Sequence, residues 1–415
     1  MSELTLVIVG NGMAANRILE LIGDSHPFDV IHVLSEESIP HYNRIMLSPL
    51  LASETTLAGI TPHDDNWYKS RKIQVHLNTK AIELNTQQKR VLASGGIVFN
   101  YDALVIATGS RSFIPDLPGT HEATNVIGFR DMNDVNHMLE SLPTLRHATV
   151  IGAGLLGVEA AVGLKMQGAE VTLMHRNPVL MNRQLDAKAS GILNAELRRR
   201  GIDVQTGVNP SELTLENGKA TEVYYSNSAK ESCTLPTDLV VFATGIQPNT
   251  DLAKSSGLLT QRGVCVDQHM RTHDEHIFSI GECCEFEGAT YGLVAPIWDQ
   301  AKVIAHQLQH WPEIHDESDR LAYVENEHLT KLKVSGLDMH SMGDFNPKDE
   351  EAEIITLDAS PEGIYKKLVI RDNRIQGVLC VGEVRDSGWY FDLLKSQTDI
   401  SDIRTQLIFG KAWCS

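Results

Sequence analysis

The 415-residue sequence predicts an α/β fold with two Rossmann-like dinucleotide-binding domains, one inserted into the other, and a small C-terminal α/β domain. Two observations support this prediction. An apolar strand, a glycine-rich turn and a helix follow one another twice, over residues 4–21 and 148–166. Each of these units is followed, further along the chain, by an apolar strand that ends in Ala-Thr-Gly. At about 100–200 residues per domain, the length leaves room for two to four domains.

The first strand–turn–helix unit begins near the N-terminus. Leu4–Val9 is an apolar run bounded by Gly10, which is typical of a strand buried on both faces of a parallel sheet. Helical periodicity continues to Leu21, and Val30–Leu34 is the next apolar strand. The order predicts a βαβ unit.

The second unit repeats this order. Ala148–Ile151 is a strand, Gly152–Gly157 is the turn, a helix runs to about Met166, and Glu170–Met174 is the next strand. The chain is therefore expected to contain two separate units of the dinucleotide-binding type.

An internal similarity indicates the domain boundaries. Ala103–Gly109 resembles Asp238–Gly245, and each is an apolar strand ending in Ala-Thr-Gly. The simplest account is that a second nucleotide domain, residues 113–247, is inserted into the first, residues 1–112 and 248–312. A linker is expected at Trp311–Arg320, inside the junction with a C-terminal domain of residues 313–415. In that domain we expect strands at 329–334, 365–370 and 376–381 and a helix at 390–396.

Charge and hydropathy exclude several classes of function. The chain has 36 Lys and Arg against 54 Asp and Glu, a formal net charge of −18, which repels phosphate backbones and anionic membranes. Nucleic acid and membrane are therefore not expected as partners. The N-terminus lacks a basic region before its first apolar run, and no run of about 18 apolar residues occurs. We expect a cytoplasmic protein.

The cysteines and histidines do not predict a metal site. The six cysteines show no Cys-x-x-Cys spacing, and none precedes Cys233, which disfavours a disulfide framework, a structural zinc and an iron–sulfur cluster. His273 and His276 form a His-x-x-His pair without an acidic or cysteine partner at ligand spacing. We expect them to be exposed turn residues.

The first turn, Gly10-x-Gly12-x-x-Ala15, has the residues of a diphosphate-binding loop. Its first glycine makes the tight turn, its second lets the backbone approach a diphosphate, and the small third residue lets helix and strand pack closely. Ala14 lies beside the third position. Past the next strand stands Glu36, a candidate acceptor for a ribose hydroxyl, whereas its neighbour Glu37 is expected to be a solvated loop charge.

The second turn carries the full glycine set, Gly152, Gly154 and Gly157, with Leu155 and Leu156 at the helix start. The next strand ends in His175-Arg176, so the usual carboxylate for a 2′-hydroxyl is missing. Arg176 beside a 2′-phosphate would favour NADPH, and a surface arginine beside an NADH site is the equal alternative.

Two dinucleotide sites suggest FAD held permanently, in the first domain, and a nicotinamide nucleotide that comes and goes, in the second. Gly281-Glu282 follows the strand Ile277–Ile280 and is placed to return to the ribityl chain and diphosphate of FAD.

This ordered set of motifs resembles the two-dinucleotide flavoprotein fold of glutathione reductase and its relatives. Within that superfamily, Tyr42–Pro49, Leu180–Asp186 and Gly281–Pro296 resemble the N-terminal flavin module of the NAD(P)H-dependent nitrite reductase large subunit. The tail motifs Gly388–Leu393 and Thr398–Ser401 extend the resemblance almost to the end of the chain.

The resemblance implies further cofactor-binding residues, several with an alternative interpretation. Arg44 is expected to bind flavin phosphate or to form a surface pair with a glutamate. Trp298 is expected near the isoalloxazine or as a core aromatic at a helix start, and Glu159 at the nicotinamide carboxamide or as a helix surface charge. The remaining positions are Ser48, Thr108, Gly109, Gly245 and Pro296.

The resemblance also has departures. The sequence ends about where the cysteine-rich iron–sulfur segment and sirohaem domain of the nitrite reductase would begin, so we do not expect it to reduce nitrite to ammonia itself. Pro49 stands where ferredoxin and rubredoxin reductases tend to carry lysine, which favours the nitrate/nitrite branch. Disulfide reductases need an early redox cysteine pair, which is missing. For Cys283-Cys284 we expect ordinary packing rather than a strained vicinal disulfide.

The sequence therefore predicts an FAD-dependent NAD(P)H:acceptor oxidoreductase that passes electrons from NADH through FAD to a partner redox protein in nitrate or nitrite assimilation. The resemblance favours NADH, with NADPH possible. No catalytic acid or base is nominated, because the expected role of the protein is to place the cofactors. A rubredoxin or ferredoxin reductase is the first alternative, and a non-catalytic flavin-binding regulatory subunit is the second.

Overall fold

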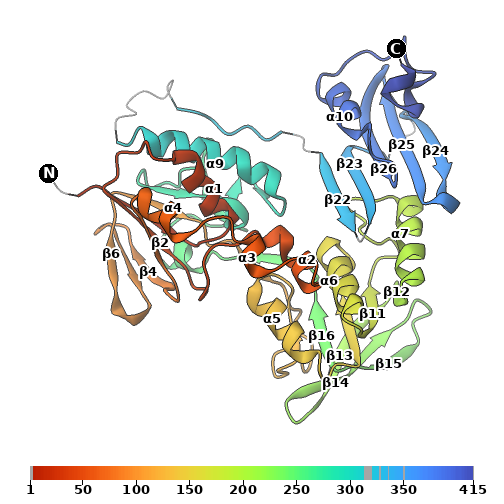
Figure 1. The fold of residues 1–415 in the computed structure, drawn as a ribbon, viewed down its shortest axis with the longest axis horizontal. Coiled ribbons are helices and arrows are strands. Elements are labelled where there is room, and N and C mark those ends of the chain that lie inside the picture. Colours follow the sequence, from red (N-terminus) through yellow and green to blue (C-terminus); the bar gives the residue numbers. More distant parts are fainter. Residues whose placement is uncertain (1–2, 313–319, 327–328, 335, 349–350, 415) are drawn as a thin grey trace. The chain divides into compact units, whose positions relative to one another are not determined.

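The computed structural model describes residues 3–312, 320–326, 329–334, 336–348 and 351–414 (Figure 1). The chain folds into two compact units, and each is made of three segments. The first unit comprises Met1–Leu47, Thr55–Arg111 and Ile246–Asn326, and the second comprises Ser48–Glu54, Ser112–Gly245 and Glu327–Ser415.

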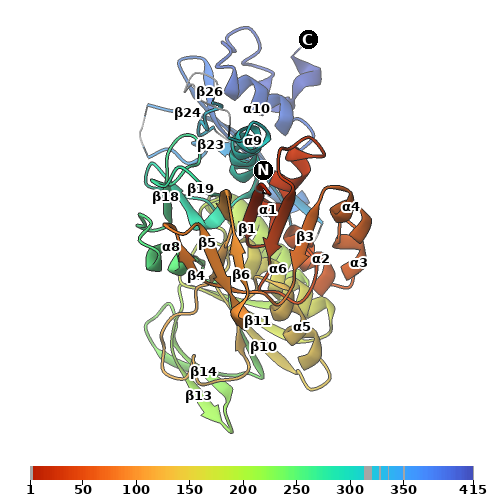
Figure 2. The same cartoon turned by 90° about the vertical axis from the view of Figure 1, so that its left-hand side faces the viewer.

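The first unit is built on a five-stranded parallel sheet, in the order β19-β7-β1-β2-β3. Its middle strand is apolar on both sides because both faces of the sheet are covered. Leu6 and Ile8 face a core shared with helices α1 and α9, whereas Val7 and Val9 face a core shared with a three-stranded antiparallel sheet, β4-β5-β6 (Figure 2). The parallel elements are β1 Thr5–Val9, α1 Met13–Ile22, β2 Val30–Leu34, β3 Ile73–His76, β7 Ala103–Ile106, β19 Ile277–Ser279 and α9 Val294–Gln309.

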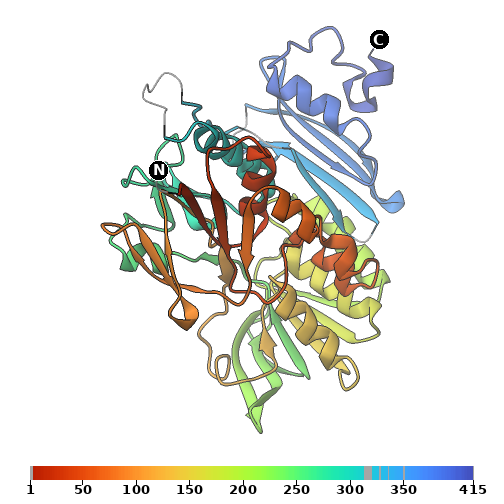
Figure 3. The same ribbon diagram turned by 60° about the vertical axis from the view of Figure 1, so that its left-hand side comes forward.

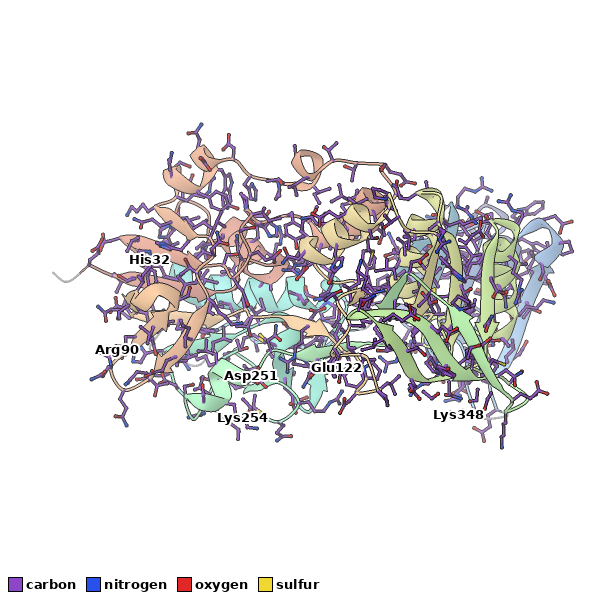
Figure 4. The ribbon with its side chains drawn as sticks, turned by 90° about the horizontal axis from the view of Figure 1, so that it is seen from below. His32, Arg90, Glu122, Asp251, Lys254 and Lys348 are labelled. Atoms are coloured by element: carbon purple, nitrogen blue, oxygen red, sulfur yellow. The ribbon has the colours of Figure 1, made fainter. Side chains whose placement is uncertain are left out.

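Smaller elements complete the first unit. Figure 4 labels Arg90 on β5 and Asp251 and Lys254 on α8, three exposed charged residues. The elements are α3 Leu57–Ile60, α4 Asp65–Ser70, β4 Ala81–Asn85, β5 Arg90–Ala93, β6 Val98–Asn100, β17 Ile246–Pro248, α8 Asp251–Ser255, β18 Val264–Val266, β20 Cys284–Phe286 and β21 Ala289–Thr290.

A second parallel sheet forms the centre of the second unit, in the order β12-β11-β10-β16-β9. The elements of this part are α2 Leu47–Leu51, β9 Val126–Ile127, α5 Met132–Ser141, β10 His147–Ile151, α6 Leu155–Met166, β11 Glu170–His175, α7 Ala187–Arg199, β12 Ile202–Thr206, β13 Asn209–Glu216, β14 Lys219–Ser226, β15 Ser232–Pro236 and β16 Leu239–Phe242. The short strand β8, Ser110–Ser112, includes the last residues of a first-unit segment and the first residue of this one. Both predicted βαβ units are confirmed by these two sheets.

The C-terminal part of the second unit is an antiparallel sheet, in the order β22-β23-β26-β25-β24, with α10 on it (Figure 3). Its core contains Leu368, Val378 and Tyr390, all fully buried. The elements are β22 Thr330–Val334, β23 Leu337–Gly343, β24 Glu353–Ala359, β25 Ile364–Arg371, β26 Arg374–Val381 and α10 Ser387–Lys395. The sequence predicted β22, β25, β26 and α10 but not β23 and β24, because β23 mixes polar with apolar residues and β24 is a largely exposed edge strand.

The segment after α9 packs with the first unit. Tyr323 is 3% exposed, its N–H donates to the carbonyl of Gln268 at 2.7 Å, and its ring meets Phe286 edge-on at 5.3 Å. Residues 313–319 of the expected linker lie outside the described residues. The domain division at 312/313 stays a prediction, as do those at 112/113 and 247/248, and the second unit begins again at Glu327.

Candidate dinucleotide-binding sites

The first glycine-rich turn brings β1, β7 and α1 together. Gly10 has a φ of 109°, and a Cβ there would lie 2.2 Å from the carbonyl oxygen of Ala107, so only glycine fits. Gly12 is the N-cap of α1, where no side chain caps the helix and no acidic residue occupies the first turn. A Cβ on Gly12 would meet open space. The first N–H groups of α1 therefore face a cradle that fits a diphosphate.

Segments distant in sequence form the rim of this cradle. A Cβ on Gly281 would lie 3.2 Å from the Cβ of Ala14, so the two residues are neighbours. The Glu282 carboxylate accepts from the Ser110 hydroxyl at 2.8 Å. Thr108 donates its hydroxyl to the carbonyl of Asn249 at 2.7 Å, and the Asn249 amide donates back to the carbonyl of Thr108 at 2.9 Å. The structure thus brings the predicted positions 14, 108, 109, 281 and 282 to one edge of the first sheet.

The two glutamates after β2 both pair with cations. Glu36 is 68% exposed and accepts from Lys80 at 2.7 Å. Glu37 was expected to be a solvated loop charge, and this expectation is wrong: it accepts from the Tyr42 hydroxyl at 2.7 Å and forms an ion pair with Arg44. Arg44 therefore has the glutamate partner that was one of its two predicted interpretations, and its role toward flavin phosphate stays a prediction.

Trp298 lies inside α9 rather than at the helix start that the sequence indicated. The helix begins four residues earlier, at Val294, because Pro296 falls in the first turn, where its missing N–H costs no hydrogen bond. Trp298 is partly buried, and the Arg17 guanidinium lies over its ring, 5.6 Å from the centroid. The Arg17 side chain also pairs with Glu20 at 2.9 Å.

The second glycine-rich turn repeats the first in β10, β16 and α6. Gly152 has a φ of 108°, and its Cβ would lie 2.4 Å from the carbonyl oxygen of Ala243. A Cβ on Gly157 would lie only 1.7 Å from the carbonyl oxygen of Gly152. Gly154 is the uncapped N-cap of α6 and faces open space, with partly buried Leu155 and Leu156 beginning the helix. This turn also fits a diphosphate.

The backbone of Ala153, inside this turn, is held from two sides. Its N–H donates to Nδ1 of His175 at 3.1 Å, and its carbonyl accepts from the N–H of Met181 at 2.8 Å. Because Nδ1 accepts, we assign the imidazole proton to Nε2, and burial lowers the pKa of His175. Arg176 is exposed, as is Arg183, which sequence reasoning missed. Only the folded structure indicates that Arg183 is near the second turn, because the contact between Met181 and Ala153 brings the loop that contains Arg183 beside that turn.

Glu159 is a partly buried carboxyl in α6, not the surface charge that was one of its interpretations. Burial raises its pKa to about 7, and the Ser48 hydroxyl, which donates to it at 2.5 Å, opposes the rise. Its predicted contact with a nicotinamide carboxamide stays a prediction. The carbonyl of Gly245, another predicted site residue, accepts a hydrogen bond from the N–H of Phe113 at 2.9 Å.

The structure places the adjacent cysteines and the His-x-x-His pair that the sequence analysis singled out. Cys283 and Cys284 are fully buried free thiols, and burial raises the pKa of Cys284 well above its usual value. His273 is exposed as expected, but His276 is only 28% exposed because its ring packs against Trp311. Among the described residues, no three His, Cys, Asp or Glu side chains come together as metal ligands would.

Within the part of the chain that the structure describes, no helix combines the length and the apolar character needed to cross a membrane.

Two models of known protein families match this chain. The model of the pyridine nucleotide-disulphide oxidoreductase family matches residues 4–315, and that of the rubredoxin NAD⁺ reductase C-terminal domain matches residues 329–398. The chain belongs to the pyridine nucleotide-disulphide oxidoreductase family. The name of that family describes oxidoreductases that use a pyridine nucleotide, which is the class that the sequence predicted.

Two curated relatives come from Bacillus subtilis (strain 168). The chain is 38% identical to a nitrite reductase [NAD(P)H] over 97% of its own length and 48% of the relative's. It is 34% identical to an assimilatory nitrate reductase electron transfer subunit over 98% of its own length and 51% of the relative's. The chain thus spans about half the length of these relatives. The predicted resemblance is confirmed.

Solved structures share the fold. A covalent putidaredoxin reductase–putidaredoxin complex matches with a TM-score of 0.84 at 21% identity, over 99% of this chain and 97% of that chain. The NADH:rubredoxin oxidoreductase from Clostridium acetobutylicum matches with a TM-score of 0.77 at 22% identity, over 97% of both chains. The predicted fold class is confirmed.

Proposed function

We propose that this chain passes electrons from NADH through FAD to a partner redox protein in nitrate or nitrite assimilation. The observation that carries the proposal is the pair of uncapped, glycine-lined helix N-termini in a chain whose relatives are a nitrite reductase and an electron transfer subunit. One nucleotide is held at each turn.

The first turn and its rim hold FAD. The diphosphate lies at the N-terminus of α1, and the neighbouring segments 108–109 and 281–282 approach the rest of the cofactor. The proposed FAD-binding residues are Gly10, Gly12, Ala14, Ala15, Glu36, Arg44, Ser48, Thr108, Gly109, Gly281, Glu282, Pro296 and Trp298.

The second turn holds the nicotinamide nucleotide. Its diphosphate lies at the N-terminus of α6, and its adenosine ribose lies toward the end of β11, where the second parallel strand of such units ends. The proposed residues are Gly152, Gly154, Leu155, Leu156, Gly157, Glu159, His175, Arg176 and Gly245.

The side chains of the chain position the cofactors rather than react. When bound, FAD supplies the chemistry that accepts a hydride and releases electrons singly. The backbone N–H groups of α1 and α6 bind anions, and Ala107 and Ala243 fix the turns that aim those groups. No residue is assigned as a catalytic acid or base.

NADH is the proposed coenzyme, with NADPH as a possible substitute. His175 cannot act as the acidic acceptor that a 2′-hydroxyl usually meets, because its Nδ1 is used by Ala153. Arg176 and Arg183 are exposed cations in the segments beside the turn, which a 2′-phosphate also suits. The site is therefore proposed to discriminate weakly.

The proposed partner is a nitrate or nitrite reductase, a rubredoxin or a ferredoxin, and the proposed location is the cytoplasm. A rubredoxin or ferredoxin reductase is the second candidate. The match of residues 329–398 to the rubredoxin NAD⁺ reductase C-terminal domain favours it.

The first experiment measures NADH oxidation by the purified full chain, with ferricyanide and then with rubredoxin, ferredoxin and a nitrite reductase sirohaem domain as acceptors. We expect a yellow protein with one FAD per chain, without iron, that reduces ferricyanide rapidly. Bound FAD without turnover would make the chain a regulatory subunit. Rapid rubredoxin reduction with no electron transfer to the sirohaem domain would establish the second candidate.

A further inference from the structure

We propose that the C-terminal domain controls the affinity of the second turn for its nucleotide, because a buried ion pair between Asp186 and Lys367 fixes the loop that holds the turn. The loop, residues 176–186, connects β11 to α7 and will be called the β11–α7 loop. The inference rests on the proposed binding of the nicotinamide nucleotide at Gly152–Gly157.

One end of the β11–α7 loop contacts the nucleotide turn. Met181 donates its N–H to the carbonyl of Ala153 at 2.8 Å, between the first two glycines of the turn. Met181 has a φ of 48°, a left-handed conformation that costs energy in a residue with a side chain. A strained backbone persists only where its surroundings hold it, so the loop is fixed by its contacts.

The interior of the loop is packed as firmly as a core. Leu180, Met181 and Leu185 are each 2% exposed or less. The N–H of Leu180 donates to the Ser190 hydroxyl of α7 at 2.8 Å, and the N–H of Leu185 donates to the carbonyl of Met181 at 2.9 Å. The loop therefore moves with the first turn of α7 as one piece.

The other end of the loop contacts the C-terminal domain. Asp186 caps α7 with one carboxylate oxygen, which accepts from the N–H of Ala189 at 3.0 Å. Its second oxygen accepts from the Lys367 ammonium and from the Tyr365 hydroxyl, both at 3.1 Å. Lys367 and Tyr365 both lie on β25, which is close to α7 (Figure 1). A continuous chain of contacts thus runs from β25 through Asp186 and the loop to Ala153.

Burial makes the ion pair between Asp186 and Lys367 costly to break. The side chains of Lys367 and Asp186 are 9% and 10% exposed, so removal of the lysine leaves a carboxylate without its counter-charge in a dry site. The carboxylate regains water by moving outward, and it takes the β11–α7 loop with it. Met181 then releases Ala153, and the turn loses its support. Lys367 is therefore a positioning residue that acts on the nucleotide through Asp186.

A second ion pair between α7 and the C-terminal sheet offers a matched control. Lys188, also on α7, pairs with Asp358 of β24 at 2.8 Å, but these side chains are 50% and 43% exposed. An exposed pair contributes little. Lys366, the neighbour of Lys367, provides a second control, because its buried ammonium pairs with Glu383 inside the C-terminal domain and not with α7.

The experiment measures NAD⁺ binding by calorimetry to the FAD-loaded full chain. We expect Lys367→Met to weaken NAD⁺ binding by about 2- to 30-fold, with FAD content unchanged. Lys366→Met should lower the thermal unfolding temperature without changing the Kd for NAD⁺. Lys188→Met should change neither.

A double variant keeps the test valid if Lys367→Met is unstable. Asp186→Asn with Lys367→Met removes both charges, retains a capping side chain for α7, and should restore most of the NAD⁺ affinity. By reciprocity, NAD⁺ should slow hydrogen exchange of β25 amides in the wild type.

An unchanged Kd in Lys367→Met, or a loss equal to that in Lys366→Met, would overturn the inference. Gly154→Val tests the underlying assignment separately. If that variant still binds NAD⁺ as the wild type does, the nucleotide lies elsewhere and the proposed function is wrong at this site, whatever the lysine variants show.

Discussion

The two glycine-rich turns solve one geometric problem with different residues. Gly10 and Gly152 have nearly the same φ, 109° and 108°, and each lies against the carbonyl of the alanine that directly follows a parallel strand. At the third position, however, Ala15 has a methyl group, whereas any Cβ on Gly157 would collide with Gly152. The second helix therefore lies closer to its own turn than the first does.

The surroundings of the two turns differ more than the turns themselves. Two positions after the third small residue, the first turn has Arg17, which pairs with Glu20, and the second has the partly buried Glu159. After the next strand, Glu36 and Glu37 stand at the first site and His175 and Arg176 at the second. In the proposed assignment, the shared turn geometry binds the group that both nucleotides share, the diphosphate, and the differing side chains face the parts in which the two nucleotides differ.

The largest expected effect separates the two turns by ligand. Gly12→Val should yield colourless protein, because its side chain fills the cradle at α1 that is proposed for FAD. Gly154→Val should remain yellow and lose NAD⁺ binding. Flavin absorbance and NAD⁺ calorimetry check the pair, and a yellow Gly12→Val would show that the first site is misplaced.

The next effect concerns the third position. Gly157→Ala should lower the free energy of unfolding by about 3 kcal/mol, because its methyl group overlaps a backbone carbonyl. Ala15→Gly should cost about 1 kcal/mol, the usual penalty of glycine in a helix. Urea unfolding of both variants measures the difference. Equal losses would mean that the two helices pack against their turns alike.

A smaller effect follows from Glu159. Burial raises its pKa from 4.5 to about 7, so the folded protein holds this proton more tightly than the unfolded chain does. The resulting stabilisation is complete below pH 4.5 and is lost as the pH rises to about 7. At about 1.4 kcal/mol per pKa unit, the difference between 4.5 and about 7 corresponds to about 3 kcal/mol, and the partial exposure of the side chain reduces this to about 2 kcal/mol. Glu159→Gln should remove the decline and therefore gain this free energy of unfolding on the wild type as the pH rises from 4.5 to about 8. Urea titrations of the wild type and of Glu159→Gln across that range check it.

The smallest effect concerns coenzyme choice. Arg176 is exposed, so its contact with a 2′-phosphate is worth about 1.5 kcal/mol, the low end for charge-assisted hydrogen bonds. Arg176→Ala should lower kcat/KM for NADPH by about tenfold and leave that for NADH unchanged. A strong NADPH preference in the wild type that this variant abolishes would reverse the assignment of NADH.

The sequence predicted those features of the fold that depend on residues close together along the chain. Both turns, their flanking strands and the helix α6 follow from glycine spacing and apolar runs, since these depend on neighbours along the chain. A glutamate partner was one of the two interpretations of Arg44, but the sequence did not identify it as Glu37. The start of α9 at Val294 and the strand β24 were missed, because they depend on a proline and on an exposed edge that periodicity does not encode.

The candidate sites show the same division. The sequence predicted the glycines of the second turn, Gly152, Gly154 and Gly157. It did not predict the contact of Met181 with Ala153, because the motif contains no information about a loop that returns to the turn. The Asp186–Lys367 pair joins residues separated by 181 positions. No pattern within one segment predicts a partner at that distance.

The two hydrogen bonds between Thr108 and Asn249 have a consequence for how such a chain could have evolved. These residues hydrogen-bond to each other beside the β8–β17 pair, and Phe113 and Gly245 are hydrogen-bonded at the two ends of the intervening segment. An insert whose ends meet leaves its host nearly uninterrupted, because a short bridge replaces the whole segment. A gene for one ancestral nucleotide domain could therefore receive a copy of itself at this point and still encode a host that folds, which makes duplication followed by insertion a single viable step.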